Sequence, residues 1–150
     1  MRIILCSVLA VLVVPQLATA RILYTWTYRE MFDKADLVII AQYISSKETG
    51  ERIKLKDIDL PIDGIGMVSE FEGRLVLKGS KDTTKFTLHH YRVEHQERYA
   101  NGPRVIQIAA NTHPTFLLFL IKEKDGKYAP VTGQTDPAIF SVLELMGGAR

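Results

Sequence analysis

The four histidines are the residues of this chain best suited to chemistry, because an imidazole binds metal ions and exchanges protons near neutral pH. His89 and His90 are adjacent, and His95 and His113 follow them. Neighbouring side chains of a strand point to opposite faces, so His89 and His90 are not expected to bind one metal ion together. The sequence has neither a His-x-His nor a His-Glu-x-x-His spacing, which are typical of metal sites. We therefore expect no bound metal and no other cofactor.

Glu70 and Glu72 form a pair of carboxylates on one face of a predicted strand. Basic residues follow them on the same face, which favours cross-strand ion pairs over an acid acting beside a base. The sequence also lacks the Gly-x-Ser-x-Gly elbow of serine hydrolases. These observations predict no catalytic residues. One alternative stays open, in which a metal-dependent hydrolase combines either carboxylate with His89 or His90.

The first twenty residues predict export. Arg2 precedes an apolar run from Ile3 to Val14, which is too short to span a bilayer as a stable helix. Ala18 and Ala20 supply the small side chains that signal peptidase requires at its cleavage site. Cleavage after Ala20 leaves a chain that begins at Arg21 and has no membrane-spanning segment. We expect this chain to be secreted or periplasmic.

Residues 21–150 are long enough for one domain with its own core. The only cysteine, Cys6, lies in the predicted signal peptide, so the exported domain depends on apolar burial rather than on disulfides. Without the signal peptide, 18 of the 19 basic residues remain against 17 acidic ones. A charge balance so close to neutral predicts no general attraction for nucleic acid or for acidic membranes.

A short helix is predicted from about Tyr28 to Ala35. Thr27 and Glu30 have the spacing of a capping box. Trp26 and Met31 have the spacing of a hydrophobic staple across the same helix start.

Strands are predicted next. Leu37–Ile44 is apolar on both alternating faces and rich in β-branched residues, a pattern typical of a strand that is covered on both sides. We expect a polar turn over Ser45–Gly50, an exposed strand over Arg52–Leu60 and a flexible loop over Asp63–Gly66. A long strand then runs from Met67 to Lys78, with its apolar face formed by Met67, Phe71, Leu75 and Leu77. Gly73 lies in the middle of it, where a bend or bulge is favoured.

We expect the second half of the chain to form three further strands, a hairpin after the third of them, and a helix. The strands are Lys85–Val93, a weakly paired edge at Arg104–Ala109 and a buried strand at Phe116–Ile121. Asp125-Gly126 predicts a hairpin turn that returns through Tyr128–Val131. The helix is capped by Asp136, begins at Pro137 and ends at Gly147-Gly148. Its apolar stripe consists of Ile139, Val142, Leu143 and Met146, and we expect it to cover the barrel, with an interaction helix as the alternative.

Three segments resemble strands of netrin-like domains, the group that includes tissue inhibitors of metalloproteinases. They are Ala35–Ala41, Phe71–Gly79 with its lysine-glycine turn, and Phe116–Leu120. The resemblance implies a five-stranded oligonucleotide/oligosaccharide-binding (OB) type barrel, a fold that mostly binds proteins or polymers. Arg21 stands where the animal inhibitors place a zinc-binding cysteine, and the family's disulfides are missing, so no inhibitory residue is carried over. Short exported bacterial proteins have similar strands.

The sequence therefore predicts a mainly β protein, a small closed or partly open antiparallel OB-like barrel with a short N-terminal helix and a C-terminal helix. We expect an exported binding module without catalytic machinery, whose partner is a protein or a polymer. The expected binding residues lie on one strand and on the polar loop that follows it: His89, Tyr91, His95, Arg98 and Arg104. Besides the hydrolase, an envelope structural component that assembles through an edge strand remains an alternative.

Overall fold

A computed structural model of the chain describes residues 25–55, 62–93, 104–105, 108, 113–133, 135–136 and 140–145. The elements of these residues are α1 (Tyr28–Lys34), β1 (Leu37–Leu55), β2 (Ile62–Lys78), β3 (Lys85–Val93), β4 (Arg104–Val105), β5 (Thr115–Lys122), β6 (Tyr128–Pro130), β7 (Thr135–Asp136) and β8 (Val142–Leu145). The predicted signal peptide, residues 1–20 with its cleavage site at Ala18 and Ala20, lies outside the described residues.

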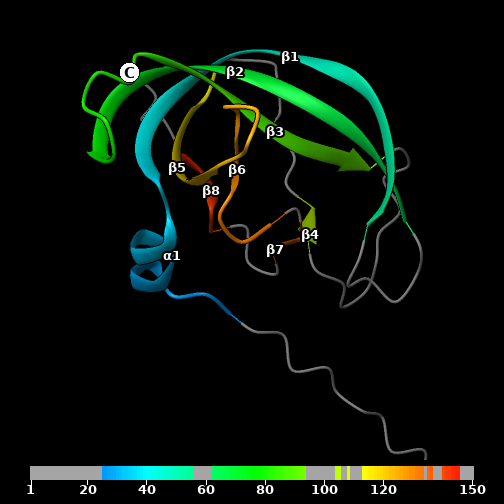
Figure 1. Ribbon diagram of the computed structural model, residues 1–150, viewed down its shortest axis with the longest axis horizontal. Coiled ribbons are helices and arrows are strands. Elements are labelled where there is room, and N and C mark those ends of the chain that lie inside the picture. The colour runs from blue at the N-terminus through cyan, green and yellow to red at the C-terminus, as the bar shows by residue number, and fades with distance from the viewer. Residues whose placement is uncertain are drawn as a thin grey trace, which may run out of the picture.

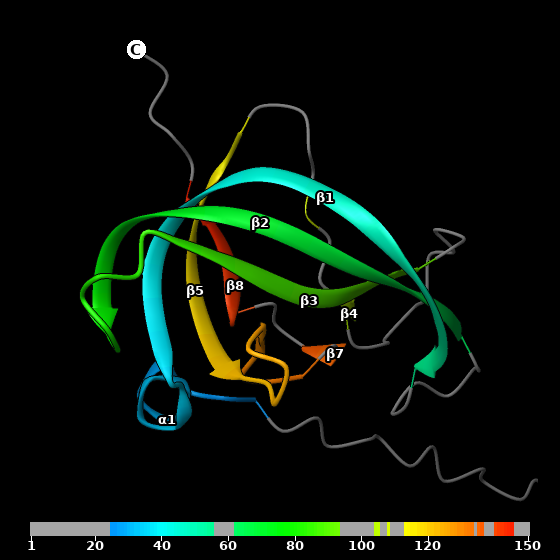
Figure 2. The same ribbon diagram turned by 45° about the horizontal axis from the view of Figure 1, so that its top comes forward.

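Five strands close into a β-barrel. The strand order is β1-β2-β3-β6-β5, and pairing between β1 and β5 completes the ring. All of these pairings are antiparallel except that of β3 with β6, where Leu88 lies opposite Tyr128. Figures 1 and 2 show β1, β2 and β3 as long, strongly curved strands that arch over β5, β6 and β8. The strand β8 pairs with β5 beside β6, while β4 and β7 form a separate two-stranded sheet.

The first part of β1 is buried on both faces, as its sequence predicts. Residues from Leu37 to Gln42 pair with β5 along one edge, and those from Val38 to Gln42 also pair with β2 along the other. Leu37, Ile39 and Ala41 belong to the apolar cluster inside the barrel. Val38 points the other way, into a second cluster beneath α1. A strand in this position is covered by the barrel core on one side and by the helix on the other.

The barrel interior is packed around Phe71, which has no exposed surface. Its ring is stacked on Phe86 at 5.5 Å and meets Tyr43 and Phe116 edge-on at 5.9 Å each. These offset and edge-on arrangements are the ones that aromatic rings prefer. The full cluster consists of Leu37, Ile39, Ala41, Tyr43, Phe71, Val76, Phe86, Leu88, Phe116, Leu118, Leu120 and Val142.

The helix α1 has the predicted start. The Thr27 side chain accepts a hydrogen bond from the Glu30 amide, and the Glu30 carboxylate accepts one from the Thr27 amide, so the capping box is complete. Met31 is fully buried, and Trp26 packs against the same cluster. At the other end, Lys78 Nζ donates to the carbonyl oxygens of Phe32 and Asp33 at 2.7 and 3.0 Å.

The part of the chain that the structure describes contains no helix with the length and apolar character of a membrane span.

The predicted turn at Ser45–Gly50 is wrong. These residues lie within the continuous strand β1, and Ser45–Glu48 pair with residues of β2. The predicted loop at Asp63–Gly66 is likewise part of β2. Both segments are polar or rich in glycine, but they extend the hairpin of β1 and β2, and strand pairing there supplies partners for their backbone groups.

The bulge expected at Gly73 is confirmed, and it reverses the face of the strand that follows. Residue 74 has no partner of its own, since Ala41 lies opposite Gly73 and Ile40 opposite Leu75. Leu75 and Leu77 are consequently 54% and 45% exposed, whereas Val76 is 9% exposed. The prediction that both leucines share the buried face of Phe71 is therefore wrong, because one inserted residue exchanges the two faces of a strand.

The C-terminal helix is not formed where its apolar stripe was expected. Val142–Leu145 is the strand β8, which pairs antiparallel with β5 through Leu118 and its neighbours. Val142 joins the barrel core, and Glu144 is exposed. Pairing with the edge of β5 outweighs the helical spacing of the sequence, because it satisfies backbone groups along both strands. Residues 137–139 and 146–150, with the rest of the stripe, lie outside the described residues.

We predict that the reversed face of β2 is visible in unfolding experiments. Phe71→Ala removes the centre of the core and is expected to lower the unfolding free energy by about 3–5 kcal/mol. Leu75→Ala is expected to change it by less than about 0.5 kcal/mol, because Leu75 is exposed. Urea unfolding of both variants beside the wild type measures these effects. A loss of several kcal/mol in Leu75→Ala would contradict the bulge.

Candidate functional site

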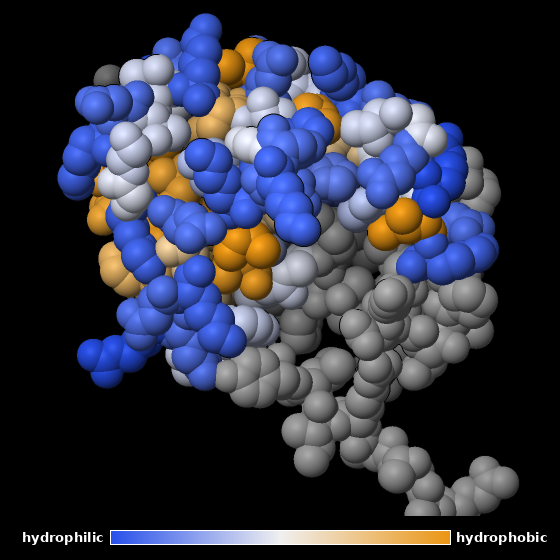
Figure 3. All heavy atoms as spheres, in the orientation of Figure 1, coloured by the Kyte–Doolittle hydropathy of each residue, from blue (hydrophilic) through white to orange (hydrophobic). Residues whose placement is uncertain are grey.

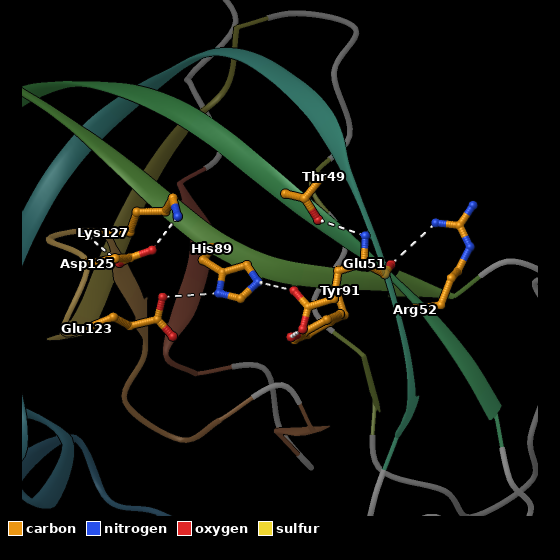
Figure 4. Close-up of polar contacts among 8 residues, drawn as sticks. All are labelled: Thr49, Glu51, Arg52, His89, Tyr91, Glu123, Asp125 and Lys127. Atoms are coloured by element: carbon orange, nitrogen blue, oxygen red, sulfur yellow. Dashed lines mark hydrogen bonds and ion pairs between the residues drawn. The ribbon is translucent and has the colours of Figure 1, made fainter.

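His89 lies between two carboxylates on the outer side of β3 (Figure 4). Its Nδ1 atom is 3.0 Å from Glu123 Oε2, and its Nε2 atom is 3.3 Å from Glu51 Oε2. The side chains of His89, Glu123 and Glu51 are 18%, 33% and 45% exposed. The three residues come from β3, from the hairpin between β5 and β6, and from β1. The imidazole therefore connects three parts of the barrel at its surface.

Tyr91 holds the Glu51 carboxylate from a second side. Its hydroxyl donates a hydrogen bond to Glu51 Oε1 at 2.7 Å, and its ring lies 5.1 Å from that of His89. Burial raises the pKa of Tyr91 above its usual value, and the hydrogen bond to Glu51 and the charges of Glu51 and Glu123 raise it further. Tyr91 therefore stays a neutral donor at all physiological pH values. We call Glu51, His89, Tyr91 and Glu123 the carboxylate–histidine cluster.

Glu51 reaches β3 because β1 is interrupted by a bulge. Glu48 lies opposite Met67 and Arg52 lies opposite Ile65, so three residues of β1 face the single residue Gly66 of β2. Within the bulge, Gly50 has a φ of 82°, which glycine adopts without strain. The Glu51 amide donates to Thr49 Oγ1 at 3.2 Å, which stabilises the bend.

Gly66 leaves open the path by which Glu51 crosses β2. It lies directly opposite Tyr91 in the sheet. A Cβ atom at Gly66 would lie 2.4 Å from Thr49 Oγ1 and 2.8 Å from Glu51 Cβ, closer than such atoms can approach. The absent side chain is thus what allows a residue of the first strand to contact the third.

Glu123 is placed by the hairpin that Asp125-Gly126 predicts. The Glu123 amide donates to the Lys127 carbonyl at 2.8 Å, and the Gly126 amide donates to the Glu123 carbonyl at 3.1 Å. Gly126 has a φ of 88°, as the turn requires. Asp125 and Lys127 form an ion pair at its tip (Figure 4). The turn is short and hydrogen-bonded, so the Glu123 carboxylate is directed at His89 by the backbone.

The cluster is arranged for hydrogen bonding rather than for metal binding. Both ring nitrogens of His89 face carboxylate oxygens, whereas a metal ion needs an imidazole lone pair aimed at it. In the part of the chain that the structure describes, no three His, Cys, Asp or Glu residues are grouped so that they would hold a metal. Chemically, the cluster offers two partly exposed carboxylates whose positions are fixed by a histidine and a tyrosine.

His90 points to the other side of β3 and is buried, at 3% exposure. Its Nε2 atom is 2.8 Å from Ser69 Oγ, which in turn lies 2.5 Å from Ser46 Oγ. Its Nδ1 atom has no hydrogen-bond partner among the described residues. Burial, together with the neighbouring His89, lowers the pKa of His90 to about 4. His90 is therefore a neutral residue of the interior.

The structure brings together two of the expected binding residues, His89 and Tyr91. His95 and Arg98 lie outside the described residues. Arg104 belongs to β4, where its backbone lies opposite Asp136 of β7.

The residue pairs that the hydrolase alternative requires are not among the contacts of these carboxylates. The Ser45 hydroxyl donates to Glu70 at 3.4 Å, and Glu72 forms an ion pair with Arg74 at 3.0 Å.

His113 is exposed, with its Nδ1 atom 3.2 Å from the Tyr43 carbonyl oxygen.

Sequence reasoning missed Glu51 and Glu123, the two carboxylates that His89 contacts. Glu51 follows a segment whose polar residues predict a turn, and Glu123 lies beside a hairpin with no distinguishing neighbours. The combination of Thr49-Gly50 with Gly66 was the one available signal, since glycines within paired strands indicate bulges or close approach.

No protein-family model, no curated protein and no solved structure matches this chain.

We predict that Tyr91 contributes stability that is lost in alkali. An unfolded tyrosine ionises near pH 10, and the raised pKa of Tyr91 delays its ionisation in the folded chain. The unfolded state therefore releases its proton first, and stability falls as the pH rises above about 10. Tyr91→Phe is expected to cost about 1 kcal/mol at pH 8 and to reduce this alkaline loss. Urea unfolding at pH 8 and pH 11 measures both effects, with Tyr28→Phe, an exposed tyrosine, as the control.

For His90 we predict the opposite pH dependence. Its pKa is about 4 when folded and about 6.5 when unfolded, so the unfolded chain takes up the proton first. Stability is complete above pH 6.5, and about 3 kcal/mol of it is lost as the pH falls from 6.5 through 4. His90→Gln is expected to remove that share of the acid sensitivity, and His113→Gln to retain it. An acid response that is the same in all three proteins would contradict the burial of His90.

Proposed function

We propose that this protein is an exported binding module, a barrel of the OB type that recognises a protein or a polymer through the carboxylate–histidine cluster and the adjoining loops. The observation that carries this proposal is the place of the cluster. It lies on the outer side of β3, between the bulged end of β1 and the β5–β6 hairpin. Barrels of the OB type bind their ligands on the corresponding strand face and the loops beside it.

The order of the strands supports the OB type. The OB fold is a five-stranded Greek-key barrel. The ring β1-β2-β3-β6-β5 also has five strands, and its one parallel contact is the short one between β3 and β6. Most residues of the segments that resemble netrin-like domains lie in β1, β2 and β5. The strand β1 pairs with both β2 and β5. In this interpretation the β5–β6 hairpin corresponds to the loop between the fourth and fifth barrel strands.

The surface chemistry favours polar recognition. The side of the molecule seen in Figure 3 is mostly hydrophilic, with small, separate apolar areas. Glu51 and Glu123 are partly exposed and already oriented, so they offer acceptor atoms to a ligand at little cost in side-chain entropy. The segment Glu94–Arg104 follows β3 directly, and we propose that His95, Arg98 and Arg104 contribute further polar contacts to the same ligand.

Recognition is favoured over catalysis by the state of the titratable residues. His89 has both ring nitrogens occupied by carboxylates, and His90 is buried against Ser69. A general base needs an accessible lone pair within reach of a substrate proton. Neither histidine offers one in this arrangement.

Site-specific crosslinking tests the proposal. We predict that a photoreactive benzoylphenylalanine in place of Lys127, on the hairpin beside Glu123, captures a partner in cells that export the protein. The same residue in place of Leu75 is the control, because Leu75 is exposed but lies at the opposite end of β2 from Gly66. A specific adduct from the first position and none from the second supports the proposal. Equal yields from both positions, or none from either, would contradict it.

A further inference from the structure

We infer that the outer parts of β1, β2 and β3 form an arm that opens as a unit while the closed barrel stays folded. The arm consists of residues 47–55, 62–68 and 91–93, and its boundary with the barrel is formed by Ser46, Ser69 and His90. The opening is a property of the fold and needs no ligand. Its consequence for binding rests on the proposed function.

The arm is an open sheet of three strands. Pairing of β1 with β5 ends at Gln42, opposite Thr115, and pairing of β3 with β6 is confined to Leu88. Beyond these residues β1 and β3 each pair with β2, and within the described part of the chain no further strand closes the ring. Figure 1 shows the three strands extending past β5, β6 and β8. The strand pairings that close the barrel therefore do not hold the arm.

Apolar packing also stops at the boundary. In the apolar clusters that the described residues form, the members closest to the arm on β1, β2 and β3 are Tyr43, Phe71 and Leu88. Ile65 and Val68 of the arm are buried but belong to neither cluster. The arm is therefore stabilised separately from the core that holds the barrel together.

A polar layer with an unpaired nitrogen lies between the two parts. Ser46 Oγ is 2.5 Å from Ser69 Oγ, which is 2.8 Å from His90 Nε2, so a chain of hydrogen bonds crosses all three strands. His90 is buried, and its Nδ1 atom has no hydrogen-bond partner among the described residues. A buried polar atom without a partner destabilises the folded state. Opening at this layer lets water reach that nitrogen, which lowers the free energy of opening there.

A bulge in β1 lies beside the polar layer. Tyr43 and Ser45 lie opposite Phe71 and Glu70, which are consecutive residues of β2, so Ile44 has no partner of its own. An unpaired residue interrupts the ladder of hydrogen bonds and bends the strand. The backbone of β1 therefore has a point at which the arm can turn relative to the barrel.

Opening of the arm divides the carboxylate–histidine cluster. Glu51 and Tyr91 belong to the arm, whereas His89 follows the core residue Leu88 and Glu123 lies on the β5–β6 hairpin (Figure 4). The Glu51 carboxylate moves away from His89 Nε2, which lies 3.3 Å from it in the closed arrangement, and keeps its hydrogen bond to Tyr91. If this cluster binds the ligand, as the proposed function has it, the arm sets the spacing of the two carboxylates that the ligand meets.

Native-state hydrogen exchange at low urea concentrations tests the arm without a ligand. Met67 and Val68 lie between β1 and β3 in the arm, and Ile39 and Ile40 lie between β2 and β5 in the barrel. We call the protection factors of the first pair divided by those of the second the arm-to-barrel ratio. It is expected to be about one tenth, with a weaker urea dependence in the arm, because opening exposes less surface than unfolding. Equal protection with equal urea dependence would overturn the inference.

Two variants test the polar layer with effects of opposite sign. Ser69→Ala removes the partner of His90 Nε2 and is expected to lower the arm-to-barrel ratio about threefold. Ser69→Ala combined with His90→Leu makes the layer apolar, and is expected to raise the ratio about threefold above the wild type. Ser45→Ala is the matched control, because Ser45 is an exposed serine beside the boundary, and it is expected to leave the ratio unchanged.

A ratio that changes in the same direction in both variants, or that changes equally in Ser45→Ala, would contradict the role of the layer. The exchange measurements and the crosslinking experiment fail independently, since the first report the opening of the arm and the second reports the binding face.

Discussion

A residue of one strand contacts a residue two strands away only if the strand between them presents no side chain. Gly66 provides this condition in β2, and the bulge at Thr49–Glu51 supplies the side chain that uses it. The contacts of Glu51 with His89 and Tyr91 depend on both features. A sheet normally separates the first and third strands by about 10 Å, twice the spacing of neighbouring strands. The contacts of the cluster therefore depend first on the backbone geometry of β1 and β2, and only then on the attraction between its charged groups.

Closure of the barrel positions Glu123, the second carboxylate that contacts His89. Because β1 pairs with both β2 and β5, the chain between β5 and β6 is brought to the side of β3. The turn at Asp125-Gly126 then directs Glu123 toward His89 from the opposite side to Glu51. The interior face of β3 meanwhile carries Phe86 and Leu88 into the core. Alternate residues of β3 thus pack in the barrel core, and the residues between them face the surface cluster, because successive side chains of a strand point to opposite faces.

The sequence predicted the features that depend on neighbours along the chain. The capping box at Thr27, the bulge at Gly73 and the hairpin at Asp125-Gly126 are local, and the structure has all three. The faces of Leu75 and Leu77 depend on the pairing of β2 with a distant segment, and their prediction was wrong. Pairing with β5 likewise makes Val142–Leu145 a strand, where the sequence predicted part of a helix. In the site, His89 and Tyr91 were found as a pair two residues apart on one strand. Glu51 and Glu123 were not, since 38 and 34 residues separate them from His89 in the sequence and only barrel closure brings them together.

The most direct test of this account is a double-mutant cycle between Glu51 and His89, measured once with Gly66 and once with Gly66→Ala. Unfolding free energies of Glu51→Gln, His89→Gln and the double variant give the coupling energy of the pair. With Gly66 in place the account predicts a coupling of about 0.5–1 kcal/mol, as for other partly exposed polar pairs. With alanine there, Glu51 is displaced and the coupling falls to zero. An undiminished coupling in the Gly66→Ala background would contradict the claim that this glycine opens the path across β2.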